Sequence, residues 1–229
     1  MIFFIGMDDT DNTESRGTGH LARQVAACLA DDFEILGVVR HQLLFDPRVP
    51  YTKNNSSASI VLKAGNSVSL DLVFQQVKEC MLGDFQPGSD PGLCVAAEVP
   101  AEVTEFGRRA KLELVTQEEA HRLASKYGIL LEELGGSGGG VIGALAGAGL
   151  AASGEDGRYV QVGRMRELSG LQPVATVLAA GVDRLQTPDG QLVTHGMILT
   201  SKLRPARRGG CPVAYVQWNE DHWQPLKLD

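Results

Sequence analysis

The sequence lacks the features that mark secreted, membrane-bound and zinc-stabilised proteins. Its four cysteines lie far apart, at Cys28, Cys80, Cys94 and Cys211. They form no C-x-x-C pair, which argues against a zinc ribbon, and they give no disulfide framework, so we expect reduced thiols. The apolar start, Met1 to Gly6, has no basic flank or cleavage site, and the longest small-apolar run, 141–152, is too short and glycine-rich to span a bilayer. We therefore expect a cytoplasmic protein with no membrane partner.

An excess of positive charge is also missing. The 21 lysines and arginines are outnumbered by 28 acids, which gives a net charge of -7. The chain as a whole therefore does not attract nucleic acid, although a local basic patch could. Hydrophobic residues make up 43% of the 229 positions, which is ordinary for a globular protein of one large or two small domains.

The first hundred residues alternate between strand and helix patterns. Short apolar runs predict strands at 2–7, 33–40, 57–62 and 93–99. Apolar residues at helical spacing predict one helix around 21–29 and another from 70 to about 82. This order is that of the split βαβ pattern of a ferredoxin-like sheet. We predict an α+β fold whose N-terminal half, 1–100, is ferredoxin-like.

The second half, 101–229, predicts a mixed α/β arrangement. Thr116 and Glu119 form a capping box at a helix start, and a helix of small residues follows from about Val141. Short strands and turns follow Arg158, and Trp218 and Trp223 are expected to pack in a hairpin. A boundary near residue 100 or 155, or one integrated domain, fits this pattern, with both halves sharing a nucleotide site.

Three carboxylates lie within four residues directly after the first strand, at Asp8, Asp9 and Asp11. Such closely spaced acids repel one another unless a cation lies between them, and Mg²⁺ carrying phosphates is the usual partner. Gly17, Thr18 and Gly19 then lead into a helix, whose first amides form a natural phosphate cradle. The other interpretation is a turn rich in Asp, with Thr18 as a plain N-cap.

The segment Gly6-Met-Asp-Asp-Thr-Asp11, followed by Gly17-Thr18, resembles the opening of the archaeal tRNA(Ile2) 2-agmatinylcytidine synthetases. Two later stretches are similar to that family in the same order: Asp46 to Ser57, and Gly139-Gly-Val-Ile-Gly-Ala144. The resemblance implies that Asp8, Asp9 and Asp11 bind Mg²⁺ and ATP, with Asp8 also catalytic. It further implies that Thr18 accepts phosphate.

The same resemblance and the local chemistry together extend the predicted nucleotide site. Lys53 and Asn55 offer donors to phosphate or a base edge, in a loop that could equally be a bonded surface loop. Gly139 and Gly140 begin the helix of small residues, where glycines serve either close backbone packing or approach of the nucleotide to the helix N-terminus, which we favour. The match to G-x-G-x-x-G at 138–143 is isolated and does not predict a dinucleotide fold.

The sequence departs from the family in parts that concern RNA. Arg16 to Gly19 replaces the family's M-C-T-T stretch, and neither an OB-fold nor a zinc ribbon follows, as in a short form of the family. The basic loop 201–210 is either a solvated turn or a polyanion contact. We expect weak, salt-sensitive tRNA binding through Arg204, Arg207 and Arg208.

We therefore predict an Mg²⁺-dependent, ATP-binding enzyme of kinase-like or ligase type. Its acceptor is an undetermined small molecule or RNA, and its oligomeric state is left open. The alternatives are a non-catalytic nucleotide- or metal-sensing module, and a tRNA-modifying protein whose partner grips the RNA.

Overall fold

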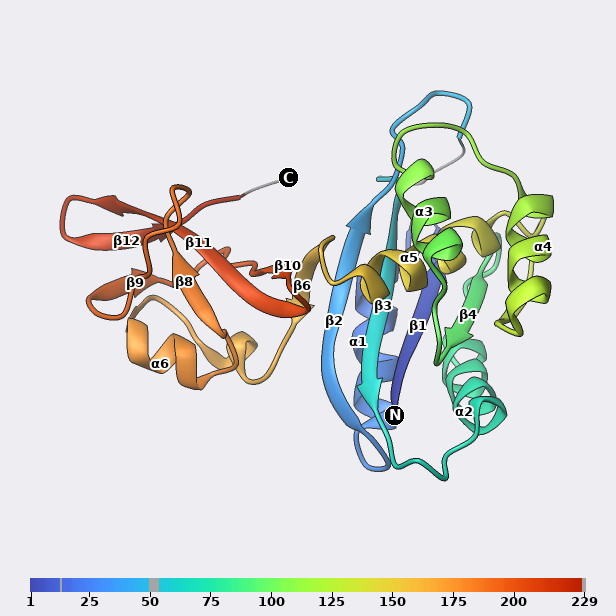
Figure 1. Cartoon of the computed structure of the whole chain (residues 1–229), viewed down its shortest axis with the longest axis horizontal. Helices are drawn as coiled ribbons and strands as arrows, with labels where there is room; N and C mark the ends of the chain where they lie inside the picture. Colours follow the sequence, from blue (N-terminus) through green and yellow to red (C-terminus); the bar gives the residue numbers. More distant parts are fainter. Residues whose placement is uncertain (13, 50–53, 228–229) are drawn as a thin grey trace.

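The computed structural model describes residues 1–12, 14–49 and 54–227. The chain forms two lobes, a larger N-terminal α/β lobe and a smaller strand-rich C-terminal lobe (Figure 1). No helix among the described residues is long and apolar enough to cross a membrane.

The predicted order of the first elements is confirmed. They are β1 (Ile2–Asp8), α1 (Thr18–Leu29), β2 (Glu34–Gln42), β3 (Ser56–Lys63), α2 (Leu70–Leu82) and β4 (Gly92–Ala96). The strands lie side by side as β4-β1-β3-β2, and all neighbours are antiparallel. In this register Ile5 lies opposite both Ile60 and Val95. This is the ferredoxin-like arrangement, and the predicted fold class is confirmed.

Alternation along β1 divides the lobe into two hydrophobic layers. Phe3, Ile5 and Met7 are fully buried beneath α1 and α2, together with Val25 and Phe74 from those helices. The opposite face is covered by α3 (Ala101–Arg109), α4 (Gln117–Tyr127) and α5 (Gly140–Ser153), while β5 (Leu130–Glu133) pairs with β4. Helices from beyond residue 100 thus complete the core of the strands before it.

Helix α5 lies unusually close to β1. A Cβ placed on Gly6 would come within 1.9 Å of the Ala144 carbonyl oxygen, so only glycine permits this approach. Helix α3 is absent from the sequence interpretation, although its sequence carries helix-end signals. Glu102 lies in its first turn and Arg108 and Arg109 in its last, which suits the helix dipole.

The C-terminal lobe extends the sheet. Its elements are β6 (Arg158–Gln161), η1 (Met165–Glu167), β7 (Leu171–Pro173), α6 (Val174–Ala179), β8 (Arg184–Gln186), β9 (Met197–Leu199), β10 (Ala206–Arg208), β11 (Cys211–Asn219) and β12 (His222–Pro225). Strand β6 pairs with both β2 and β10, which joins the lobes. A separate core fills this lobe, and the predicted Trp218–Trp223 packing is confirmed by a 5.0 Å edge-to-face contact.

The cysteines correct one expectation. Cys28 of α1 and Cys80 of α2 form a disulfide, contrary to the predicted reduced thiols. The two are 52 residues apart, and only the packing of α1 beside α2 on one face of the sheet brings them together. Cys94 and Cys211 are free.

Candidate functional site

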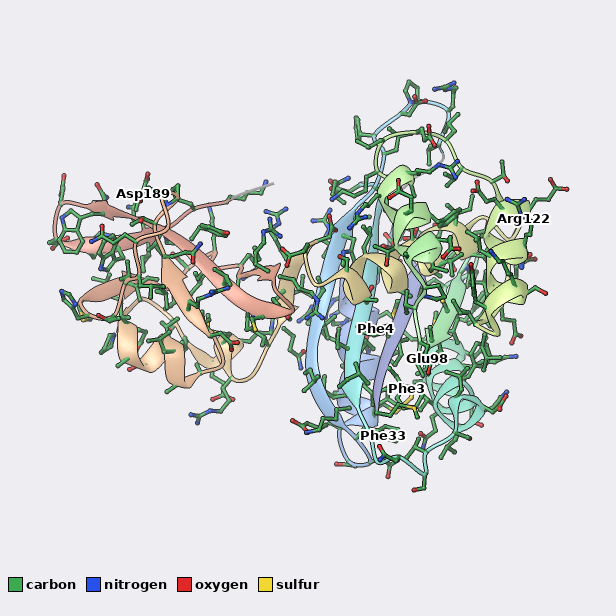
Figure 2. The ribbon with its side chains drawn as sticks, in the orientation of Figure 1. Phe3, Phe4, Phe33, Glu98, Arg122 and Asp189 are labelled. Atoms are coloured by element: carbon green, nitrogen blue, oxygen red, sulfur yellow. A yellow bond between two sulfur atoms is a disulfide. The ribbon has the colours of Figure 1, made fainter. Side chains whose placement is uncertain are left out.

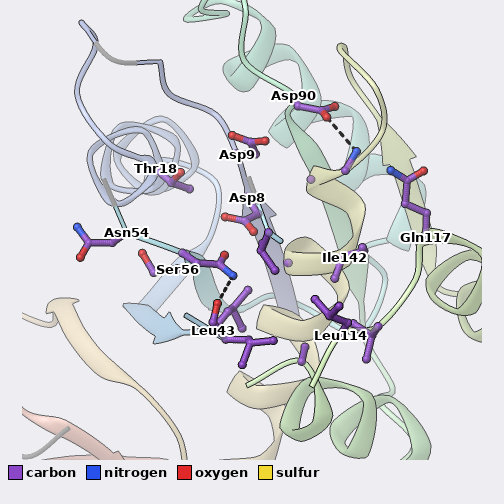
Figure 3. A pocket seen from close by; sticks show the side chains of 18 of the residues that line it. Asp8, Asp9, Thr18, Leu43, Asn54, Ser56, Asp90, Leu114, Gln117 and Ile142 are labelled. Atoms are coloured by element: carbon purple, nitrogen blue, oxygen red, sulfur yellow. Dashed lines mark hydrogen bonds between the residues drawn. The ribbon is translucent and has the colours of Figure 1, made fainter. Parts of the chain in front are cut away.

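A cavity of about 250 Å³ opens at the C-terminal end of β1, between the start of α1, the β2–β3 connection and the start of α5 (Figure 3). Its described lining includes most of the predicted site residues: Asp8, Asp9, Asp11, Thr18, Asn55, Gly139 and Gly140. Segments from both predicted halves contribute to it. We refer to it as the acidic pocket.

The charge of this pocket is one-sided. Asp8, Asp9 and Asp11 are joined by Asp90, from the loop before β4, and by Glu113, from the loop after α3. No lysine or arginine is present among its described lining residues. Carboxylates gathered in a partly desolvated cavity favour a bound cation or added protons over the ionised, empty state.

The carboxyl groups of Asp8 and Asp9 both have raised pKa values. Burial raises the pKa of Asp8 to about 7, although a hydrogen bond from the Asp9 backbone opposes this and the nearby charges of Asp9 and Asp11 add to it. Burial also raises the pKa of Asp9 to about 6, and the charges of Asp90 and Asp11 contribute. Asp9 has a positive φ of 49°, which Asp tolerates better than most residues. The ionised pocket is therefore unfavourable until a cation compensates it.

We expect Asp8→Asn to stabilise the metal-free protein at neutral pH. A pKa raised above the unfolded value contributes stability below about pH 4 that is lost as pH rises to about 7. The shift sets an upper limit of about 4 kcal/mol at pH 8, and relaxation of the pocket should reduce the gain to ~1–2 kcal/mol. Urea unfolding in EDTA at pH 5 and pH 8 measures it. An equal difference between variant and wild type at both pH values would contradict the raised pKa.

Thr18 is a buried pocket residue and not a helix cap. It is the first residue of α1, and the N-cap is Gly17, which provides no side-chain hydrogen bond. The Thr18 hydroxyl, only 7% exposed with its residue, instead donates to the Asp11 carboxylate at 3.1 Å. The alternative interpretation of Thr18 as a plain N-cap is therefore wrong. The hydroxyl is hydrogen-bonded to the Asp11 carboxylate, and both residues line the pocket.

The start of α5 is already occupied by a side chain. The Asp90 carboxylate accepts hydrogen bonds from the backbone N–H of Gly138 at 2.7 Å and of Gly139 at 3.0 Å. It also accepts one from the Ser137 hydroxyl. The Gly139 amide is thus not free to cradle a phosphate, although Gly139 and Gly140 line the pocket. Asp90 supplies the anion that the helix N-terminus favours.

The glycines of α5 serve close packing and the site together. A Cβ on Gly140 would lie 2.2 Å from the Asp90 carbonyl oxygen, and one on Gly143 would lie 1.7 Å from Oδ2 of Asp8. The missing side chain of Gly143 therefore makes the space in which the Asp8 carboxylate lies. The structure displays the close packing of these glycines, and approach of a nucleotide to this helix start stays a prediction.

The remaining predicted residues are placed as follows. Gly17 and Gly19 are outside the described lining, since Thr18 is the residue at the start of α1 that lines the pocket. The Asn55 side chain lines the pocket but donates to the Leu44 carbonyl at 2.7 Å, so it also fixes the β2–β3 connection. Lys53 lies outside the described residues. His41 of β2 is fully buried outside this lining, and its imidazole contacts the Asp156 carboxylate at 2.9 Å.

The carboxylates do not enclose a metal by themselves. Within the described ranges, no group of three or more His, Cys, Asp or Glu side chains is arranged to hold a metal ion. The raised pKa values of Asp8 and Asp9, in a pocket whose described lining holds no lysine or arginine, nevertheless suit a cation bound by one or two carboxylates. Mg²⁺ usually completes such a site with water and phosphate oxygens.

Sequence reasoning missed one side of the pocket. Leu43, Leu114 and Ile142 form an apolar wall facing the carboxylates (Figure 3). These residues come from three distant segments, so no local pattern joins them. An apolar wall opposite polar groups is the usual form of a small-molecule site. Asp90 carried one detectable signal, since it lies in a Ser-Asp-Pro-Gly sequence just before β4, the strand that pairs with β1.

Comparison with known proteins agrees with the resemblance. No family model matches the chain. The sequence is 30% identical over 154 residues to tRNA(Ile2) 2-agmatinylcytidine synthetase TiaS of Pyrococcus horikoshii. This match covers 65% of the chain and 36% of TiaS, so the chain spans about a third of that relative's length.

Solved structures show the same fold over the same share of the chain. A TiaS–tRNA(Ile2)–ATP complex and a tRNA fluorescent labeling enzyme each match with a TM-score of 0.58 and 24% identity. Each match covers 65% of this chain and 36% of the other. The predicted resemblance to the tRNA(Ile2) 2-agmatinylcytidine synthetases is confirmed over this part of the chain.

Proposed function

We propose that the acidic pocket binds ATP together with Mg²⁺ and that the chain is an ATP-dependent enzyme acting on RNA. One observation carries the proposal. Four aspartates and a buried hydroxyl line one cavity that has no basic lining residue among the described positions. Such a pocket repels a free polyphosphate and accepts one that is neutralised by a divalent cation.

The residues divide into a metal-binding side and a base-binding side. One or two of the carboxylates Asp8, Asp9 and Asp11 would hold Mg²⁺, and the bound ion would neutralise charge on the phosphates. Leu43, Leu114 and Ile142 offer the flat apolar contact that a nucleobase favours. Asp90 keeps the start of α5 rigid through its bonds to Gly138 and Gly139.

Thr18 is the proposed phosphate acceptor. Its hydroxyl oxygen attacks the terminal phosphorus of ATP, the bond from that phosphorus to the bridging oxygen breaks, and ADP leaves. The hydroxyl proton passes to Asp11, which already accepts its hydrogen bond at 3.1 Å. The relatives support phosphate chemistry followed by ligation to an amine, since the matched TiaS structures include complexes with tRNA(Ile2) and ATP and with an ATP analogue and agmatine.

Product analysis tests this proposal. The purified chain is incubated with ATP and excess MgCl₂, with and without tRNA, and the nucleotide products are separated. We expect ADP to appear only with Mg²⁺, and we expect Asp8→Asn to abolish its formation; AMP as the first nucleotide product would contradict transfer of the terminal phosphate to Thr18. Binding of ATP without any turnover under all these conditions would instead favour the non-catalytic sensing module.

A further inference from the structure

A second cavity, of about 220 Å³, lies in the C-terminal lobe between segments 159–168 and 200–205. Arg166, Lys202 and Arg204 line it, together with the hydroxyl residues Thr200 and Ser201. No acidic residue lines it within the described part of the chain. Its charge is therefore opposite to that of the acidic pocket.

One face of α1 continues this positive charge. His20 and Arg23 are three residues apart on α1, so they lie on the same side of the helix, and Arg16 precedes the helix and reaches His20 by contact. Both arginines contact the imidazole of His20, Arg16 at 3.3 Å and Arg23 at 3.2 Å. A neutral imidazole has one N–H and one accepting nitrogen. In one of the two contacts an arginine N–H therefore faces the imidazole N–H. An anion would relieve that conflict.

The arginines at the start of α1 and those of the second cavity affect one another's pKa values. Burial, followed by the charges of Arg166, Arg204 and Arg16, lowers the pKa of Arg23. Burial, followed by the charges of Arg166 and Arg158, lowers the pKa of Arg204. Arg23 of α1 therefore lies near enough to Arg166 and Arg204 of the second cavity for their charges to act on it. We call Arg16, His20, Arg23, Arg166, Lys202 and Arg204 the basic track.

Carboxylates do not balance this charge. Among the described residues, none lies within 4.0 Å of the guanidinium groups of Arg23, Arg166 or Arg204. Those groups donate instead to the backbone carbonyls of Gly19, Val160 and Leu203. Asp84 is the acid that acts on His20. Elsewhere Arg109 forms ion pairs with Glu113 and Glu119. The lack of carboxylate partners among the described residues is therefore a feature of Arg23, Arg166 and Arg204 and not of every arginine.

The basic loop predicted from sequence contributes only in part. Arg207 is buried and donates to the Ala151 carbonyl, the Tyr159 hydroxyl and the Gly210 carbonyl, so it ties β10 to α5. Arg208 donates to the Glu155 carbonyl. The expectation that Arg207 contacts RNA is therefore wrong. Arg204 is exposed and belongs to the track.

We propose that the basic track binds successive phosphates of an RNA strand whose neighbouring nucleotide enters the acidic pocket. The proposal rests on the proposed function for the RNA acceptor. Arg16 lies between Asp11 and Thr18, which both line the acidic pocket, so the track begins at the edge of that pocket. Its extent across α1 and a second cavity exceeds one phosphate group and suits a polymer with repeated charge.

Fluorescence anisotropy with a labelled 20-nucleotide single-stranded RNA tests the proposal. The test variant carries Arg23→Gln, Arg166→Gln and Arg204→Gln. The control variant removes the same charge from α3 and α4, as Arg108→Gln, Arg122→Gln and Lys126→Gln. Arg122 lies on the side of the N-terminal lobe that faces away from the C-terminal lobe (Figure 2). We expect the test variant to bind at least about tenfold more weakly and to lose about 2 from the slope of log K against log salt, while the control resembles wild type.

Two further measurements separate charge from structure and from the proposed function. Replacing the same three arginines by lysine should keep most of the affinity, and the glutamine variant should bind ATP with Mg²⁺ as wild type does. Equal RNA affinity in wild type and the test variant, or equal losses in test and control, would overturn the proposal. Displacement of the RNA by micromolar pyrophosphate would also overturn it in favour of a small phosphate ligand. Failure of ATP binding in every protein would instead remove the proposed function.

Discussion

Thr18→Ala should lower ATP turnover about 100-fold or more while leaving the fold nearly intact. The hydroxyl is buried, lines the acidic pocket and donates to Asp11 at 3.1 Å. Removing it deletes the proposed phosphate acceptor, and a single acid–base or nucleophilic group typically contributes a factor of about 10² to 10⁴. The lost hydrogen bond contributes only about 1 kcal/mol to folding. Paired measurements of thermal melting and ATP consumption reveal both effects.

Thr18→Ser is the matched control, because it keeps the hydroxyl and loses one methyl group. We expect it to retain turnover within about tenfold of wild type, at a stability loss of about 1 kcal/mol. Mass spectrometry should detect phosphate on residue 18 in wild type and in Thr18→Ser, and none on that residue in Thr18→Ala. Wild-type turnover in Thr18→Ala would contradict any catalytic role for this residue.

Gly143→Ala should weaken binding of Mg²⁺-ATP at least about tenfold without unfolding the protein. The added Cβ would lie 1.7 Å from Oδ2 and 2.4 Å from Cγ of Asp8, so the carboxylate must leave its place. Alanine is favoured over glycine inside a helix by about 1 kcal/mol, which offsets part of the strain. A tenfold change in affinity corresponds to about 1.4 kcal/mol. Calorimetric titration with ATP in excess MgCl₂ measures the change.

Gly19→Ala is the companion variant. Its added Cβ meets no atom within 4 Å, and its backbone is helical, so alanine should stabilise α1 slightly. It should leave nucleotide affinity unchanged, since Gly19 is outside the described pocket lining. Undiminished affinity in Gly143→Ala would show that the position of Asp8 does not govern binding. A loss in Gly19→Ala alone would restore the sequence-based role of Gly19.

Local patterns predicted the N-terminal fold because each element there has a clear period. The apolar run of β1, the helical spacing of α1 and α2 and the run of β3 identify the split βαβ order without tertiary information. The acidic turn after β1 was likewise visible, because consecutive carboxylates at a strand end are uncommon unless they bind something. The resemblance at Gly6 to Asp11 added the nucleotide.

Features that depend on distant segments were not predictable. Asp90 and Ile142 reach the pocket only because β4 and α5 both pack against β1. The Cys28–Cys80 disulfide and the buried role of Arg207 arise in the same way, from neighbours 52 and 56 residues away in the chain. Thr18 was visible as a helix start, but its turn towards Asp11 was decided by tertiary contacts.

The central claim is that the acidic pocket binds ATP only together with a divalent cation, and calorimetric titration of the wild-type chain tests it most directly. ATP is titrated at pH 7.5 into protein with excess MgCl₂ and, separately, into protein with EDTA. Because Asp8, Asp9, Asp11 and Asp90 line one pocket and burial raises the pKa values of Asp8 and Asp9, ATP should bind at least about tenfold more tightly with Mg²⁺. Equal affinity in Mg²⁺ and in EDTA would contradict the account.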